Sequence, residues 1–253
     1  MQDFSMEPIR GKEGTVVTAR NLSVADIPAM LRCEQNTWPP DWQASEPSMR
    51  ARLDRFPEGF FGLFQGEDLV AMTSSMIKPD FHPHRLNGYG DSKCTWDVIT
   101  GNGLIENHDP NGNSLYVVSV GVRKDKQGLG IGRGLINVQK LLAQRLGLDW
   151  VWLGARMPQF RDYLEAKYQV NLPKGDDLKF SQVAKELGIP YKQEVNEYAQ
   201  LTRPEDGLRT DYELRFYDRG GLKHVKAKPD FGPDGESFGA GAIVAYKVFR
   251  NSR

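Results

Sequence analysis

Residues 115–134 read LYVVSVGVRKDKQGLGIGRG, and this stretch decides the fold because a strand-forming run passes through a short polar turn into a glycine-rich loop. The β-branched and aromatic residues from Leu115 to Val122 predict a buried strand. The following LINVQKLLAQRLG has apolar residues at helical spacing and closes at Gly147, so it predicts a helix. Loop glycines let backbone N–H groups approach an anion, and a helix N-terminus adds partial positive charge. The loop from Gln127 to Gly132 is therefore predicted to hold a pyrophosphate group.

The spacing of the glycines tests two other nucleotide-binding motifs. A dinucleotide fingerprint requires G-x-G-x-x-G, but the third glycine position is Arg133 when counted from Gly128 and Leu135 when counted from Gly130. A Walker loop requires a lysine and a hydroxyl residue after its last glycine, and both are missing. Both motifs are excluded, whereas a glycine-rich turn that only joins strand to helix remains an alternative.

The pattern that fits is Q/R-x-x-G-x-G/A after a strand, matched by Gln127, Gly130 and Gly132. In this motif, and in the order of predicted elements from Thr15 to Tyr168, the sequence resembles the GCN5-related N-acetyltransferase (GNAT) superfamily. Three stretches more narrowly resemble bacterial GNAT modules that occur alone or fused to carbon–nitrogen hydrolases: TGNGLIENHDPNGNSLYVV, GARMPQFRDYL and DGESFGAGAIVAY.

The fold class expected is α/β, with a GNAT-like mixed, mostly antiparallel central sheet, helices on both faces and a helical insertion at about residues 171–210. One domain is expected over residues 15–253, after a flexible N-terminus at 1–14. A first strand, two helices and a hairpin precede the motif strand, and a strand and helix follow it. The last strands are predicted at LRFYDR, LKHVKA and GAIVAYKVF.

Composition excludes several classes of protein. Of the 253 residues, 39% are apolar and 26% charged, which predicts a folded core. Lys plus Arg and Asp plus Glu both number 33, so no global charge favours nucleic acid or an anionic membrane. No signal peptide or membrane span is recognised. The two cysteines, Cys33 and Cys94, lack metal-ligand spacing, so we expect a cytoplasmic protein without a metal site.

The resemblance implies an acyl-CoA co-substrate, most simply acetyl-CoA, lying along the motif strand where it splays from the strand that begins at Trp150. The pantetheine arm would pair with backbone groups of Val120 and Val122, and an amide near Val120 would polarise the thioester carbonyl. The pyrophosphate would be bound by amides of the loop residues Gln127, Gly128, Leu129, Gly130, Ile131, Gly132 and Arg133.

Acyl transfer to an amine requires a deprotonated amine and benefits from a proton for the leaving thiolate. The resemblance implies Tyr163 as the acid, with Tyr168 as the second choice and simple packing of Tyr163 against the sheet as the alternative. Glu106 and His108 are the predicted bases, although their segment also reads as an ordinary polar turn. Arg156 stands where the family usually has asparagine. Three tryptophans are expected to border the acceptor side or to be core: Trp38, Trp42 and Trp96.

The leading hypothesis is acyl-CoA-dependent N-acyltransfer, directly from donor to acceptor in a ternary complex. The acceptor would be a small-molecule amine or a carrier protein. A GNAT-like decarboxylase of malonyl-CoA that passes acetyl to a carrier-protein thiol is the second hypothesis, although its catalytic histidine is not found after the motif strand. A non-catalytic CoA-binding module is the third. The sequence determines neither the acceptor, the acyl length nor the oligomeric state.

Overall fold

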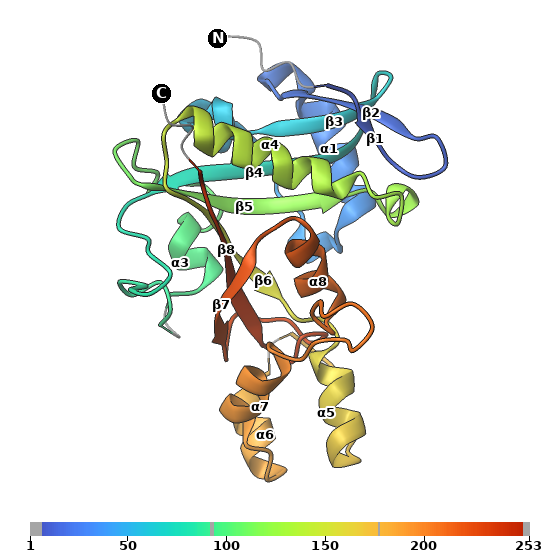
Figure 1. Cartoon of the computed structure of the whole chain (residues 1–253), viewed down its shortest axis with the longest axis vertical. Coiled ribbons are helices and arrows are strands. Elements are labelled where there is room, and N and C mark those ends of the chain that lie inside the picture. Colours follow the sequence, from blue (N-terminus) through green and yellow to red (C-terminus); the bar gives the residue numbers. More distant parts are fainter. Residues whose placement is uncertain (1–6, 92–93, 177, 250–253) are drawn as a thin grey trace. The chain divides into compact units, whose positions relative to one another are not determined.

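The computed structural model describes residues 7–91, 94–176 and 178–249, with eight strands and eight α-helices in that part of the chain (Figure 1). The chain forms two compact units. The first comprises residues 1–80, 100–151 and 247–253, and the second comprises 81–99 and 152–246. The expected single domain over 15–253 stays a prediction. Of the N-terminus expected to be flexible, residues 1–6 lie outside the description, and the rest contains a short strand, Ile9–Arg10.

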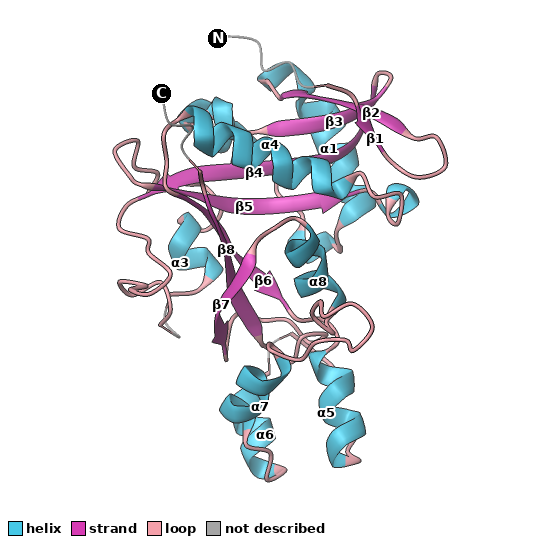
Figure 2. Cartoon of the chain, viewed as in Figure 1, coloured by secondary structure: helices cyan, strands magenta, loops and turns pink. Residues whose placement is uncertain are grey.

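The first unit contains five strands in the order β1-β2-β3-β4-β5, each antiparallel to the next (Figure 2). The predicted hairpin and motif strand are confirmed. The bounds are β1 Ile9–Arg10, β2 Val16–Asn21, β3 Phe61–Gln65, β4 Asp68–Lys78 and β5 Ser114–Val122.

Three α-helices of the first unit follow the predicted pattern: α1 Ile27–Thr37, α2 Glu46–Arg55 and α4 Gly132–Arg145. Pro39 and Pro40 follow α1, where proline cannot continue a helix. Ser45 caps α2, because its hydroxyl accepts a hydrogen bond from the Ser48 N–H at 3.4 Å. Short 3₁₀ turns occupy Val24–Asp26, Pro40–Trp42, Pro57–Gly59 and Lys124–Lys126.

Helices cover both faces of the strands in the first unit. Neighbouring residues of a strand point to opposite faces, and on β4 Met72 packs in the core cluster with α1 and α2 residues such as Met30 and Leu53. The next residue, Thr73, accepts a hydrogen bond from Gln139 of α4. In Figure 1, α4 accordingly crosses one side of the strands and α1 the other. The two-faced arrangement predicted from the sequence is confirmed.

The second unit contains the strands β6 Trp150–Arg156, β7 Lys223–Lys228 and β8 Gly241–Lys247, with β8 between the other two and antiparallel to β7. The first two residues of β6 belong to the first unit. The α-helices are α3 Trp96–Thr100, α5 Phe160–Tyr168, α6 Phe180–Glu186, α7 Tyr191–Tyr198 and α8 Tyr212–Arg219. Helices α6 and α7 confirm the helical insertion predicted at about 171–210.

The strand predicted at LRFYDR is wrong, because these residues form most of α8. Asp211 caps this helix, and its side chain accepts hydrogen bonds from the N–H groups of Glu213 and Leu214 at 2.9 and 3.1 Å. Leu214 and Tyr217, one helical turn apart, are the buried residues of α8. The run begins Leu-Arg-Phe, an alternation that also fits a strand, and it is too short for its pattern to decide between helix and strand.

No helix in the described residues combines the length and the apolar character that a membrane crossing requires.

Candidate functional site

The predicted anion-binding loop joins β5 to α4, and two glycines give it its shape. Gly128 and Gly130 both have φ of +78°, a conformation that favours glycine, and a Cβ on either would meet nothing within 4 Å. The side-chain amide of Gln127 donates to the Val122 carbonyl at 3.0 Å, which ties the loop to the end of β5. Leu129 is held by a hydrogen bond of 2.8 Å from the Lys12 N–H to its carbonyl.

The backbone amides of this loop are left without acceptors. Across residues 7–91, 94–176 and 178–249, the N–H groups from Gly128 to Arg133 donate no hydrogen bond, and the next amide, that of Gly134, donates to the Ile131 carbonyl at 2.8 Å. The 14-residue helix α4 begins at Gly132, and its partial positive charge falls on the same groups. These amides therefore fit the pyrophosphate predicted for this loop.

A β-bulge changes the course of β5 before the loop. Ser74 of β4 pairs with Ser119 and Ser75 with Val117, so Val118 is an extra residue in β5. Such bulges bend a strand and increase its twist. Residues 114–118 are buried, whereas Ser119 and Val120 are partly exposed. The bulge therefore marks the point where β5 becomes accessible.

The peptide that links Ser119 to Val120 is held from β4. The Thr73 hydroxyl donates to the Ser119 carbonyl at 2.7 Å, and the buried Gln139 amide donates to the Thr73 hydroxyl at 3.3 Å. A trans peptide directs its C=O and N–H in opposite directions, and no cis peptide occurs among the described residues. The Val120 N–H therefore points away from β4. Sequence reasoning missed Thr73 and Gln139, because their contacts join three elements and leave no local pattern.

Two of the three predicted tryptophans lie together beside β5. A Cβ on Gly121 would come within 3.0 Å of the Thr37 side chain and 3.3 Å of the Trp38 indole nitrogen, so Trp38 lies directly against the strand. The rings of Trp38 and Trp42 stack with centroids 6.4 Å apart. Trp96 belongs to the second unit. That these rings border an acceptor stays a prediction.

His108 is held by a hydrogen bond and by ring stacking within the fold. Its Nδ1 accepts a hydrogen bond of 3.0 Å from the Ile77 N–H, and its ring stacks on Phe56 with centroids 4.6 Å apart. Burial lowers the pKa of His108. A neutral ring that accepts at Nδ1 carries its proton on Nε2, so neither nitrogen has a lone pair for a substrate ammonium. This geometry argues against His108 as the base.

Glu106 lies at the surface of the same segment. Its side chain is 61% exposed and reaches Arg55 at 3.8 Å. Nearby, the Asp109 carboxylate accepts a hydrogen bond from the Asn111 N–H at 2.9 Å, as in a polar turn. The role of Glu106 as a base stays a prediction. The contacts of this segment are those of an ordinary polar turn.

In the second unit, Tyr163 belongs to a polar cluster on α5 and α7. Its hydroxyl donates to Glu194 at 3.0 Å and accepts from Lys167 at 3.0 Å, while Tyr168 donates to Glu194 at 2.7 Å. Burial raises the pKa of Tyr163. Its role as the acid rests on the resemblance and stays a prediction.

Arg156, at the position of the family's usual asparagine, is committed to carboxylates in its own unit. Its guanidinium donates to Asp234 at 2.7 and 2.9 Å and to Glu236 at 2.8 Å. The Ser237 hydroxyl accepts from the Met157 N–H at 3.2 Å. Arg156 therefore anchors the segment before β8.

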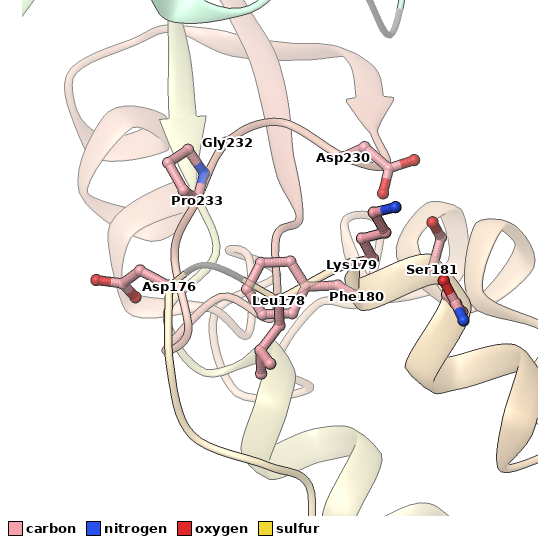
Figure 3. Close-up of a pocket in the computed structure, with 9 residues that line it drawn as sticks. Asp176, Leu178, Lys179, Phe180, Ser181, Asp230, Gly232 and Pro233 are labelled. Carbon is pink, nitrogen blue, oxygen red and sulfur yellow. The ribbon is translucent and has the colours of Figure 1, made fainter.

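Two cavities lie away from the predicted site residues. One, of ≈ 540 Å³ in the second unit, is shown in Figure 3 and is lined by residues of 176–182 and 230–233. The other, of ≈ 340 Å³ in the first unit, is lined by residues of α1 and by Asp68 and Arg123. Neither includes the glycine loop.

No protein-family model matches the chain. An uncharacterised N-acetyltransferase of Bacillus subtilis, YkwB, is 26% identical over 245 residues, which cover 94% of this chain and 91% of the relative. A probable hydrolase of the same organism, YhcX, is 31% identical over 147 residues, or 58% of this chain. The match spans only 27% of that hydrolase, consistent with a related module inside a longer protein.

Solved structures share the fold. The loading GNATL domain of CurA from Lyngbya majuscula has a TM-score of 0.69 at 19% identity, covering 92% of this chain and 98% of that domain. The GphF GNAT-like decarboxylase, solved with isobutyryl-CoA, has a TM-score of 0.63 at 19% identity, covering 91% and 99%. At this identity the likeness concerns the fold alone.

Proposed function

Because this chain belongs to the GCN5-related N-acetyltransferase superfamily, we propose that it transfers an acyl group from acyl-CoA, with acetyl-CoA the first choice, to an amine. The observation that carries the proposal is the set of loop amides from Gly128 to Arg133, which have no acceptor among the described residues. Backbone donors at a helix N-terminus are suited to a pyrophosphate.

The residues that would hold the donor are those of β5 and the loop. The pyrophosphate would bind the amides of Gly128 to Arg133, and the pantetheine arm would run along β5 near Val120 and Val122. The donor supplies a thioester, whose carbonyl carbon the amine attacks. A splay of β5 from the strand at Trp150, which the resemblance implies for this arm, stays a prediction.

In the proposed reaction, the amine nitrogen forms a bond to the thioester carbonyl carbon, the carbon–sulfur bond breaks, and the sulfur takes up a proton. The Val120 N–H, which points away from β4, would donate to the carbonyl oxygen as negative charge develops there. The Thr73 and Gln139 hydrogen bonds would fix this amide before the reaction.

The reaction also moves two protons, one away from the amine and one to the sulfur. His108 offers no free lone pair in the arrangement described, so we propose that water relays the amine proton to a more distant base. Tyr163 remains the proposed acid. Replacing Tyr163 by phenylalanine removes only the hydroxyl, and turnover should then fall while acetyl-CoA affinity stays unchanged.

The two other hypotheses differ in measurable ways. A decarboxylase would release carbon dioxide from malonyl-CoA and load a carrier-protein thiol, and its support here is the fold shared with GphF. A binding module would bind CoA without turnover. We favour N-acyltransfer because the relative that matches almost the whole chain is named an N-acetyltransferase.

The test is to incubate the protein with acetyl-CoA or malonyl-CoA, with and without amines or a carrier protein, and to follow CoA release and product mass. Acetylated amine with acetyl-CoA as donor is the expected product. Tight binding of CoA with no turnover across a broad panel would favour the binding module. Failure to bind any acyl-CoA would contradict all three hypotheses.

A further inference from the structure

A buried arginine of α2 contacts β4. Arg52 of α2 is 5% exposed, and its guanidinium donates to the Gly103 carbonyl at 2.7 Å and to the Ser74 hydroxyl at 3.3 Å. Burial lowers the pKa of Arg52 to about 10, so the side chain remains charged at neutral pH.

No carboxylate contacts this charge in the part of the chain that the structure describes: no ion pair within 4.0 Å involves Arg52. Glu34, itself buried, acts on it only through space, and the Glu34 carboxylate accepts a hydrogen bond from the Ala44 N–H at 2.9 Å. A buried charge without a contacting counter-charge is costly. A negative group close to Arg52 would therefore lower the free-energy cost of burying its charge.

Two serines connect Arg52 to the accessible part of β5. The hydroxyls of Ser74 and Ser119 are 2.9 Å apart. Because the Ser74 oxygen accepts from the guanidinium, its own hydrogen is available to Ser119, and hydrogen bonds aligned in this way strengthen one another. The Ser119 hydrogen is then available to a ligand. Ser74 is buried, whereas Ser119 is partly exposed.

The Ser119 side chain lies on one particular face of β5. Ser119 and Gly121 lie on the same face of β5, because residues two apart in a strand share a face. Trp38 covers Gly121 on that face. Helix α4, which begins at the glycine loop, packs on the other face through Gln139. The Ser119 hydroxyl therefore lies on the face of β5 that Trp38 covers at Gly121, opposite α4.

We propose that Ser119 donates a hydrogen bond to a carboxylate of the substrate, and that Ser74 and Arg52 are positioning residues that act through it. The proposal rests on the proposed function, because it supposes an acyl transfer at β5. The carboxylate can belong to the acyl group of the donor or to the acceptor amine, and the chemistry of recognition is the same.

Two arms of one experiment distinguish the sources. The first compares the affinities of malonyl-CoA and acetyl-CoA by calorimetry. The second compares kcat/KM for L-phenylalanine and phenethylamine, which differ only in the carboxylate, at fixed acetyl-CoA. In one of the two arms, wild type should show the higher affinity or the higher kcat/KM for the compound that carries the carboxylate. Ser119→Ala should lower this ratio about 10-fold, the effect of one hydrogen bond to a charged group.

Further variants separate recognition from structure. Ser119→Thr keeps a hydroxyl and should retain the preference, whereas Ser74→Ala should lower it. Ser75→Ala is the matched control: Ser75 is also buried on β4, but its hydroxyl donates to the Gly59 carbonyl at 3.2 Å. Arg52→Lys, checked by thermal melting for folding, should lower the carboxylate preference more than it lowers activity on phenethylamine.

The outcomes are decisive. No preference for the carboxylate in either arm, or a preference that Ser119→Ala leaves intact, overturns the proposal, while acetylation of an amine by wild type upholds the proposed function. Loss of the preference in the malonyl-CoA arm assigns the carboxylate to the donor, and in the phenylalanine arm to the acceptor. Absence of any acetyl-CoA binding to wild type would instead refute the proposed function itself.

Discussion

Two polar turns flank β5, and they differ in whether their polar groups have hydrogen-bond partners within the described chain. In the turn before the strand, His108 accepts from the Ile77 N–H, Asp109 accepts from the Asn111 N–H, and Glu106 pairs with Arg55. In the loop after the strand, the amides of Gly128 to Arg133 have no acceptor in the described chain. Buried polar groups normally have hydrogen-bond partners in the protein or in ordered water, whereas exposed amides are open to solvent or a ligand. The contrast therefore separates a turn that supports the fold from a loop suited to a ligand.

The largest effect is expected from Gly130→Glu. The new carboxylate places a negative charge among the amides proposed to bind pyrophosphate, and we expect acetyl-CoA affinity to fall by about 100-fold or more, the cost of losing several charge-assisted hydrogen bonds. Calorimetry measures the change.

The matched control is Gly147→Glu, because Gly147 also has a positive φ, +69°, and open space around a Cβ. Both variants carry the same backbone strain, about 1–2 kcal/mol. Equal loss of affinity in the two variants would show that strain, and not the loop, governs binding.

An intermediate effect is expected from Thr73→Val, which keeps the shape of the side chain and removes the donor to the Ser119 carbonyl. Loosening the Val120 amide should lower kcat about 10-fold, the value of roughly one hydrogen bond. Acetyl-CoA affinity should stay within about twofold, because the loop is untouched. Steady-state kinetics and calorimetry measure the two quantities, with Ser75→Ala as the control. An unchanged kcat would contradict the role given to this amide.

The smallest effect on activity is expected in the turn before β5. Asparagine at position 108 can place an oxygen near the position of Nδ1 and accept from the Ile77 N–H, so His108→Asn should leave kcat within about threefold and its pH profile unchanged. A fall of about 100-fold or more, the range of general base catalysis, would restore His108 as the base.

The same variant has a predicted pH signature in stability. Burial lowers the pKa of His108 in the folded protein, so the unfolded chain binds the proton more readily. The contribution of the neutral ring is complete above the unfolded pKa of about 6.5 and is lost as the pH falls through the folded value. Denaturant unfolding measures the free energy of unfolding at pH 7.5 and at pH 5.5. The decrease in this free energy from pH 7.5 to pH 5.5 should be smaller for His108→Asn than for wild type.

The sequence predicted the glycine loop and the motif strand because their patterns are local. Glycine spacing, a β-branched run and helical periodicity are all contained within residues 115–147, and the loop conformation follows from Gly128 and Gly130 themselves. The strand predicted for Leu214 to Arg219 is wrong because a run of six residues is too short to distinguish the helical from the strand periodicity. The feature that favours the helix is the capping side chain of Asp211.

The contacts around Ser119 were beyond local patterns. Thr73 and Ser74 contact Ser119 only because β4 and β5 pair in the sheet, and Gln139 contacts Thr73 only because α4 packs on β4. One clue was present in the sequence: Arg52 shares the apolar face of its helix with Met49, Leu53 and Phe56, at spacings where a buried side chain is expected. A charged residue on such a face marks a buried polar contact.

The most direct test of the loop's role is a ¹H–¹⁵N NMR titration of the labelled protein with CoA. The account predicts saturable downfield shifts for the amides of Gly128, Gly130 and Gly132, because their N–H groups gain phosphate acceptors, with little change for the amides of Asn111 and Gly112 in the turn before β5. Saturable CoA binding that leaves the loop amides unmoved would contradict the assignment of the pyrophosphate to this loop.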